Sequence, residues 1–168
     1  RIFAEEKATG TMEFLMTTPT SNTSIVLGKY LGSFLFFSLL LGITVLYYFI
    51  IEYFGQPDRW PVLTGFLGLW LEGGLFVAVG ILTSSWTRSQ VVAAIMSYVI
   101  LFLVYFSASF IPYAPESFAP VIRHISTLTH AANFGVGLIT LADVVYYLSG
   151  IALCLVLTRI SVENRLWR

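Results

Sequence analysis

The sequence predicts an all-α protein, a polytopic bundle of membrane-spanning helices. The 168-residue chain is 57% hydrophobic and only 11% charged, whereas soluble domains carry about 25% charged residues. Four apolar runs are long enough to cross a bilayer, which takes about 20 helical residues. None alternates apolar and polar residues with the period of two that a membrane β-strand requires. We therefore expect a single transmembrane domain, residues 1–168.

The four predicted spans cover residues 24–54, 62–86, 90–111 and 144–160. The first is longer than a hydrocarbon core of about 30 Å requires at about 1.5 Å per residue, so we expect it to tilt or to extend beyond the interface. The third span should end at Pro112, because proline lacks the N–H that a regular helix needs.

Three connections of different kinds join the spans. Residues 55–61 form a short turn, and residues 84–89 are so few that the second and third spans should form a tight hairpin. Residues 113–143 are longer and mixed, and we expect Asp143 to cap the fourth span. Apolar residues recur in this segment at helical spacing, which predicts a short surface or re-entrant helix: Val121, Ile122, Ile125 and Leu128.

The basic residues predict the orientation. Four spans put both ends of the chain on one side, and the side richer in Lys and Arg is cytoplasmic. Residues 113–143 and the turn at 55–61 should then lie outside. Arg59 and Arg123 are the basic residues of the outer side. The cytoplasmic side has seven: Arg1, Lys7, Lys29, Arg88, Arg159, Arg165 and Arg168.

The opening segment, residues 1–22, is charged although it stands directly ahead of an apolar span. Gly10 can end a first helical piece, Thr11 can cap a second, and Pro19 must stop it. This pattern predicts a short amphipathic helix on the cytoplasmic surface. Two interpretations stay open. One is an interfacial anchor without a partner. The other is a docking element for a soluble partner, since an anionic leaflet favours basic helices over acid-rich ones.

The opening segment and first span resemble the signature region of the type-2 ABC transporter permeases, which are of exporter type. The pattern is an acidic pair, Gly-Thr, a further Glu, Leu and Pro, then Gly-Lys within the span. The resemblance continues through residues 80–94 and 128–149 to the basic tail. It is nearest to the gliding-motility and nitrous-oxide reductase maturation permeases. The motif residues are Glu5, Glu6, Gly10, Thr11, Glu13, Leu15, Pro19, Gly28 and Lys29.

The resemblance implies a permease that couples to a separate ABC ATPase subunit and pairs with a second permease copy or a homologous permease in the inner cell membrane. ATP and magnesium would then bind in the partner, since this chain has no G-x-x-x-x-G-K-[ST] phosphate-binding loop and is not expected to be an enzyme or to hold a cofactor. Family members usually have six spans, so we expect a fragment that lacks the first two. The implied coupling residues are Glu5, Glu6, Lys7, Gly10, Thr11, Glu13, Leu15 and Pro19.

The alternative function, from another class, is a membrane anchor or scaffold. Such a subunit would hold an external complex, or transmit force to it, without transporting a solute. The long segment 113–143 is the feature that favours this alternative.

Glu72 is the most unusual single residue, because it lies near the middle of the second span. A charge at mid-bilayer costs about 2.5–3.5 kcal/mol on insertion scales, so we expect Glu72 to face the bundle interior or a cavity. It could contact a substrate or a proton, or it could be a neutral carboxyl hydrogen-bonded between helices. Related permeases generally have an apolar residue here.

The other polar and small residues favour packing over chemistry. Gly28 and Gly32 form a GxxxG pattern, and with Gly73 and Gly74 they predict close helix approach, within the chain or between subunits. His124 and His130 have no carboxylate or Cys partner nearby, so we expect no metal site. An intramembrane enzyme that uses Glu72 and the histidines is disfavoured, because these residues should lie at different depths. A net charge of zero provides no field to attract nucleic acid.

Overall fold

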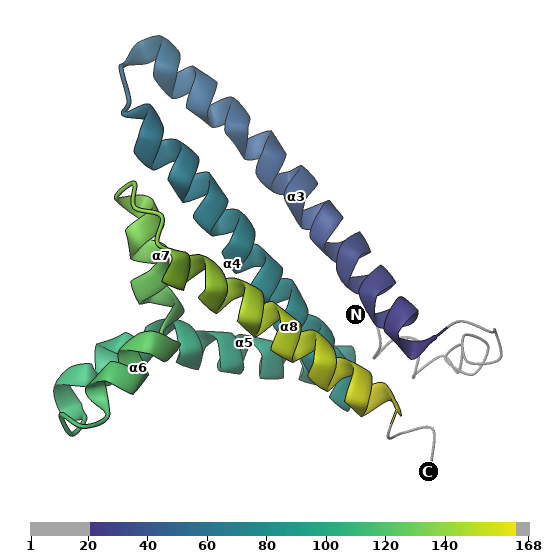
Figure 1. Cartoon of the computed structure of the whole chain (residues 1–168). Coiled ribbons are helices and arrows are strands. Elements are labelled where there is room, and N and C mark those ends of the chain that lie inside the picture. Colours follow the sequence, from purple (N-terminus) through teal and green to yellow (C-terminus); the bar gives the residue numbers. More distant parts are fainter. Residues whose placement is uncertain (1–20, 164–168) are drawn as a thin grey trace.

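The computed structural model describes residues 21–163, and every regular element in this part of the chain is helical (Figure 1). Four helices are long and apolar enough to cross a membrane. They are α3 (Asn22–Phe54), α4 (Arg59–Trp86), α5 (Gln90–Phe106) with its 3-10 continuation η1 (Ser107–Tyr113), and α8 (Leu141–Glu163). Two short helices, α6 (Ala119–Ile125) and α7 (Thr127–Gly135), precede α8. The predicted fold class is therefore confirmed.

The helix ends follow local capping chemistry. The Ser21 hydroxyl accepts a hydrogen bond from the backbone N–H of Ser24 at 3.2 Å and caps α3. The Ser89 hydroxyl caps α5 in the same way. The third span does not end at Pro112, as the sequence predicted. Its α-helical part ends at Phe106, and a tighter 3-10 winding carries the chain through Pro112 to Tyr113. Winding of this kind is common where a regular α-helix can no longer continue.

Helix α4 is the centre of the bundle and contacts α3, α5, α7 and α8. Figure 1 shows α3 and α4 as an antiparallel hairpin, with α8 running along the second half of α4. Small residues allow this close approach. A Cβ added at Gly68 would lie 2.6 Å from the Cβ of Phe134 on α7, and one added at Gly150 on α8 would lie 2.9 Å from Leu75.

Two apolar clusters hold α4 in place. The first joins α4 to α3 and α8, and the second joins it to α7 and α8. Buried residues of α4 extend from Thr64 to Ser85, so this helix is covered along most of its length. The first cluster is Val26, Tyr30, Ala78, Ile81 and Val162. The second is Leu71, Leu75, Val79, Phe134 and Tyr147.

The segment 113–143 contains two helices where the sequence predicted one. The break is at Ser126, whose backbone is extended, with φ −69° and ψ 116°. The Ser126 hydroxyl donates to the backbone oxygen of Tyr105 at 3.1 Å. This contact with α5 lets α7 turn back against α4, where the hydroxyl of Thr64 donates to the backbone oxygen of Phe134 at 2.7 Å. Contacts made in the tertiary structure thus override the local helical pattern.

The loop between α7 and α8 is fastened to the start of α4. The indole N–H of Trp60 donates to the backbone oxygen of Gly137 at 2.9 Å. Gly137 has a φ of +88°, a left-handed conformation that favours glycine. In Figure 1, α3 begins and α8 ends on the same side of the molecule as the turn between α4 and α5. An even number of spans requires this arrangement.

Candidate functional site

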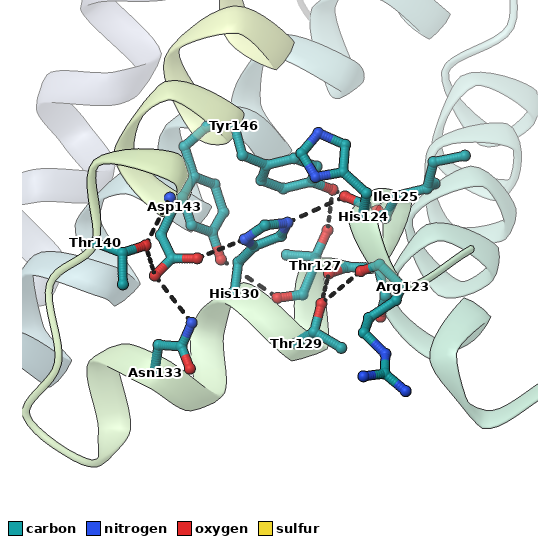
Figure 2. Close-up of polar contacts among 12 residues, drawn as sticks. Arg123, His124, Ile125, Thr127, Thr129, His130, Asn133, Thr140, Asp143 and Tyr146 are labelled. Atoms are coloured by element: carbon teal, nitrogen blue, oxygen red, sulfur yellow. Dashed lines mark hydrogen bonds and ion pairs between the residues drawn. The ribbon is translucent and has the colours of Figure 1, made fainter. Parts of the chain in front are cut away.

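Asp143 lies at the start of α8 and is buried, with 2% of its surface exposed. Its Oδ2 accepts hydrogen bonds from the Asn133 amide at 3.0 Å and from the Thr140 hydroxyl at 2.6 Å. Its Oδ1 lies 2.6 Å from Nδ1 of His130 (Figure 2). We call these four residues the Asp143 network. A buried carboxylate is tolerated when it is paired and hydrogen-bonded in this way.

His130 completes the network and is 7% exposed. Its Nε2 lies 3.0 Å from the backbone oxygen of His124, which can only accept a hydrogen bond. Nε2 must therefore carry a proton to donate to that carbonyl. The contact between Nδ1 and Oδ1 of Asp143 needs a second proton, held by one of these two atoms. The imidazole also stacks on the Tyr146 ring, with centroids 4.1 Å apart.

Hydrogen bonds extend from this network to the neighbouring helices. The Tyr146 hydroxyl donates to the backbone oxygen of Ile125 at 2.6 Å and lies 3.0 Å from the hydroxyl of Thr127 (Figure 2). Thr129 donates to the backbone oxygen of Arg123 at 2.8 Å. Helices α6, α7 and α8 are thereby held together by polar contacts at the end of the bundle where α8 begins.

This arrangement is suited to holding helices together rather than to catalysis. A histidine that acts as a general base must reach a nucleophile, but Nε2 of His130 faces a backbone carbonyl. The network borders an open pocket of about 410 Å³. Within residues 21–163, no group of three His, Cys, Asp or Glu side chains could hold a metal ion.

The Asp143 network corrects two sequence-based expectations. His130 does have a carboxylate partner, although Asp143 is distant from it in sequence and on another helix. Asp143 is not the cap of α8. The Thr140 hydroxyl accepts from the backbone N–H of Asp143 at 3.2 Å and so occupies the capping position. The spacing of Thr140 and Asp143 is the T-x-x-[DE] pattern of a capping box, a sequence signal that could have identified the correct cap.

Glu72 lies at the midpoint of α4 and is buried, with 9% of its surface exposed. Its Oε1 is fully covered and has no hydrogen-bond partner among the described residues. The side chain lines an open pocket between α4 and α5. The sequence left open whether Glu72 contacts a substrate or a proton, or is a neutral carboxyl hydrogen-bonded between helices. For Oε1, the second interpretation is wrong.

The four glycines singled out in the sequence fall into two environments. A Cβ at Gly73 would collide with the ring of Phe37, and one at Gly74 would lie 3.1 Å from Phe34, so both allow α3 to pack on α4. A Cβ at Gly28 or Gly32 would meet nothing within 4 Å. Packing among residues 21–163 therefore does not explain the GxxxG pattern on α3.

The coupling residues proposed from the opening segment lie outside the described residues, so the structure places none of them. They are Glu5, Glu6, Lys7, Gly10, Thr11, Glu13, Leu15 and Pro19.

Fold and composition together define a multi-pass helical membrane protein. The family model described as ABC-2 family transporter protein matches residues 1–161. The chain therefore belongs to the ABC-2 transporter family, whose members are the membrane components of ABC transporters and are not themselves catalytic. Comparison with curated proteins and with solved structures gave no match.

Proposed function

We propose that this protein is the membrane-spanning permease subunit of an ATP-driven transporter and that residues 1–22 couple it to a separate ATPase subunit. The family match carries the proposal, because it covers almost the whole chain and includes the opening segment. These 168 residues contain no phosphate-binding loop, which supports an ATP site in a separate subunit. Both ends of the chain would then face the cytoplasm, on the side richer in basic residues.

The packing of α3 supports this coupling role. Helix α3 begins at Asn22, directly after the opening segment. Its buried residues Val26 and Tyr30 lie in the first cluster, together with Ala78 of α4 and Val162 of α8. Because packed interiors transmit strain, a displacement of the opening segment would reach α4 and α8 through this cluster.

A second permease copy would complete the translocation path. Helix α3 packs on α4 along one side, and an apolar stretch of 18 residues within α3 contains no residue that is buried by the described part of the chain. Small residues on its open face, among them Gly28 and Gly32, are of the kind found where membrane helices approach closely. A homologous permease would satisfy the same requirement.

Charge reversal of the acidic pair tests the coupling. We expect the double variant Glu5→Lys, Glu6→Lys to insert into the membrane at wild-type levels and to lose co-purification of the ATPase subunit. Glu116→Lys, in the exposed loop before α6, is the matched control and should retain the ATPase. If the ATPase subunit co-purifies with the double variant as it does with the wild type, the acidic pair does not dock the ATPase.

A scaffold without transport is the second candidate, and the folding of residues 113–143 favours it. Helices α6 and α7 are held to α8 by polar contacts of Asp143 and Tyr146, which gives the protein a defined surface at that end. ATP-dependent accumulation of a solute in vesicles that contain the purified complex would contradict the scaffold. The exporter direction and the gliding-motility or nitrous-oxide reductase branch remain predictions, which neighbouring reading frames would test.

A further inference from the structure

Glu72 combines burial with an unmet hydrogen-bonding need. Its Oε1 has no partner among residues 21–163, and an unsatisfied buried acceptor typically costs about 1–3 kcal/mol. The contrast with Asp143, which is saturated by three neighbours, shows that this bundle can satisfy a buried carboxylate. The free oxygen of Glu72 is therefore a specific feature of its location.

That location is a pocket of about 660 Å³ between α4 and α5. Pockets that bind small molecules typically measure about 300–1,000 Å³ and combine apolar walls with a few polar groups. Here the walls are mainly aromatic, and the lining contains no Lys, Arg or His. The lining residues are Glu72, Phe76, Tyr98, Leu101, Phe102, Tyr105 and Phe106.

The pocket follows from how α5 meets α4. Nearer the turn between α4 and α5, the hydroxyls of Thr83 and Ser97 lie 2.5 Å apart and join the two helices. From the next residue of α5 onward, aromatic rings follow one another at successive turns: the Tyr98 and Phe102 ring centroids are 6.1 Å apart, and those of Phe102 and Phe106 are 4.8 Å apart. These aromatic rings form one wall, and Glu72 lies on the other.

The mouth of the pocket opens on the outer surface of the span. Tyr98 is 70% exposed and Phe102 is 46% exposed. Since α4 and α5 are both candidate membrane spans and Glu72 is at the midpoint of α4, this surface faces the hydrocarbon. A ligand that enters here must be soluble in the lipid.

We propose that the Glu72 pocket binds amphipathic organic cations, which carry an ammonium group on an apolar or aromatic body and enter from the bilayer. The ammonium supplies positive charge and hydrogen-bond donors to the Glu72 carboxylate, which lines the pocket. The faces of Tyr98, Phe102 and Phe106 attract a cation and cover its apolar body. Anions are excluded by the carboxylate. That such cations are the transported substrates rests on the proposed permease function.

Binding of dansylcadaverine tests this site. This probe has a primary ammonium and a fluorescent aromatic body, and its N-acetylated form has the same body without the charge. The full chain, with any subunits that co-purify, is placed in lipid nanodiscs, and saturable energy transfer from tryptophan to dansyl is measured against empty nanodiscs. We expect dansylcadaverine to bind at least about tenfold more tightly than the acetylated probe, a difference within reach of one charged contact.

Three variants locate the binding. Glu72→Gln removes the charge at almost constant shape and should weaken dansylcadaverine binding at least about tenfold, without changing binding of the acetylated probe. Glu72→Asp keeps the charge and should retain most of the affinity. Glu116→Gln makes the same charge change at an exposed site and should behave as wild type. Equal binding of the two probes, or no effect of Glu72→Gln, would overturn the proposal.

A second copy of the chain could instead cover the pocket, and cysteine cross-linking detects this. If Phe102→Cys forms a disulfide between two copies in membranes and dansylcadaverine does not prevent it, a subunit interface fills the pocket and the proposal is wrong. Protection by the probe supports it. Probe binding is measured without ATP, so it can depend on Glu72 even if no ATPase subunit co-purifies. The Glu72 pocket and the coupling to an ATPase are therefore tested separately.

Discussion

Asp143 and Glu72 are both carboxylates buried in the same helical bundle, and their surroundings are opposite. Asp143 has hydrogen-bonding partners on both oxygens, from α7 and from the loop between α7 and α8. Glu72 has an oxygen without a partner among the described residues and lines an aromatic pocket. The difference teaches that burial alone does not assign a role to an acidic residue in a membrane protein. The partners distinguish a carboxylate that holds the fold from one that remains available to a ligand.

The largest effect should come from removing the Asp143 carboxylate. Breaking a buried pair on one side typically costs about 3–5 kcal/mol, so Asp143→Leu should lower the free energy of unfolding by about that amount. The change leaves His130, Asn133 and Thr140 without their acceptor. Unfolding in mixed micelles measures the loss, and Asp143→Asn should lose clearly less. Equal losses for Leu and Asn would mean that hydrogen bonding does not hold this site.

Removal of His130 should have the next largest effect. His130→Leu deletes one partner of Asp143 and the stacking on Tyr146, and we expect a loss of about 2–4 kcal/mol in the same unfolding measurement. His124→Leu is the matched control, since His124 is exposed, its hydrogen bond to His130 comes from its backbone oxygen, and its ring meets those of His130 and Tyr146 only edge-on, at 5.6 and 6.1 Å. It should change the free energy by no more than about 0.5 kcal/mol. A similar loss from both variants would contradict the assigned geometry.

A smaller loss is expected from Thr140→Val, which keeps the shape of the side chain. The variant loses the cap of α8 and the donor to Oδ2 of Asp143, together worth about 1–2 kcal/mol. Thr44→Val is the control, because Thr44 donates within α3 to the backbone oxygen of Leu41 at an exposed site. If both valine variants unfold like wild type, the cap contributes little.

The smallest effect, and one of opposite sign, should come from Glu72→Leu. This substitution removes an unsatisfied buried acceptor from an apolar surrounding, so the free energy of unfolding should rise by about 1 kcal/mol. Binding of dansylcadaverine should be lost in the same variant. Strong destabilisation by Glu72→Leu would place Glu72 with Asp143 as a residue that holds the fold.

Local sequence patterns predicted the long helices well, because membrane insertion is decided by runs of apolar residues. They predicted the Asp143 network poorly. His130 and Asp143 lie on different helices, and the loop that brings them together depends on Gly137 and on its contact with Trp60. The break at Ser126 likewise depends on a contact with Tyr105. Such contacts form between segments distant in sequence, so a reading of each segment alone does not contain them.

Glu72 shows the opposite case. A charge in an apolar run is visible in the sequence and predicts an interior or cavity position. The aromatic wall of its pocket is not predictable in the same way, since the ring pattern of Tyr98, Phe102 and Phe106 is also that of an ordinary lipid-facing helix. The angle at which α5 meets α4 turns this pattern toward the carboxyl group.

The central position of α4 has a consequence for genetics. Because α4 touches α3, α5, α7 and α8, a harmful substitution on its Glu72 side can be compensated by a shift of any of these four helices. Second-site suppressors of such a mutation should therefore be spread over the chain instead of clustering beside it. Among related sequences, substitutions at residues that line the pocket should therefore occur together with substitutions at positions distant from the pocket.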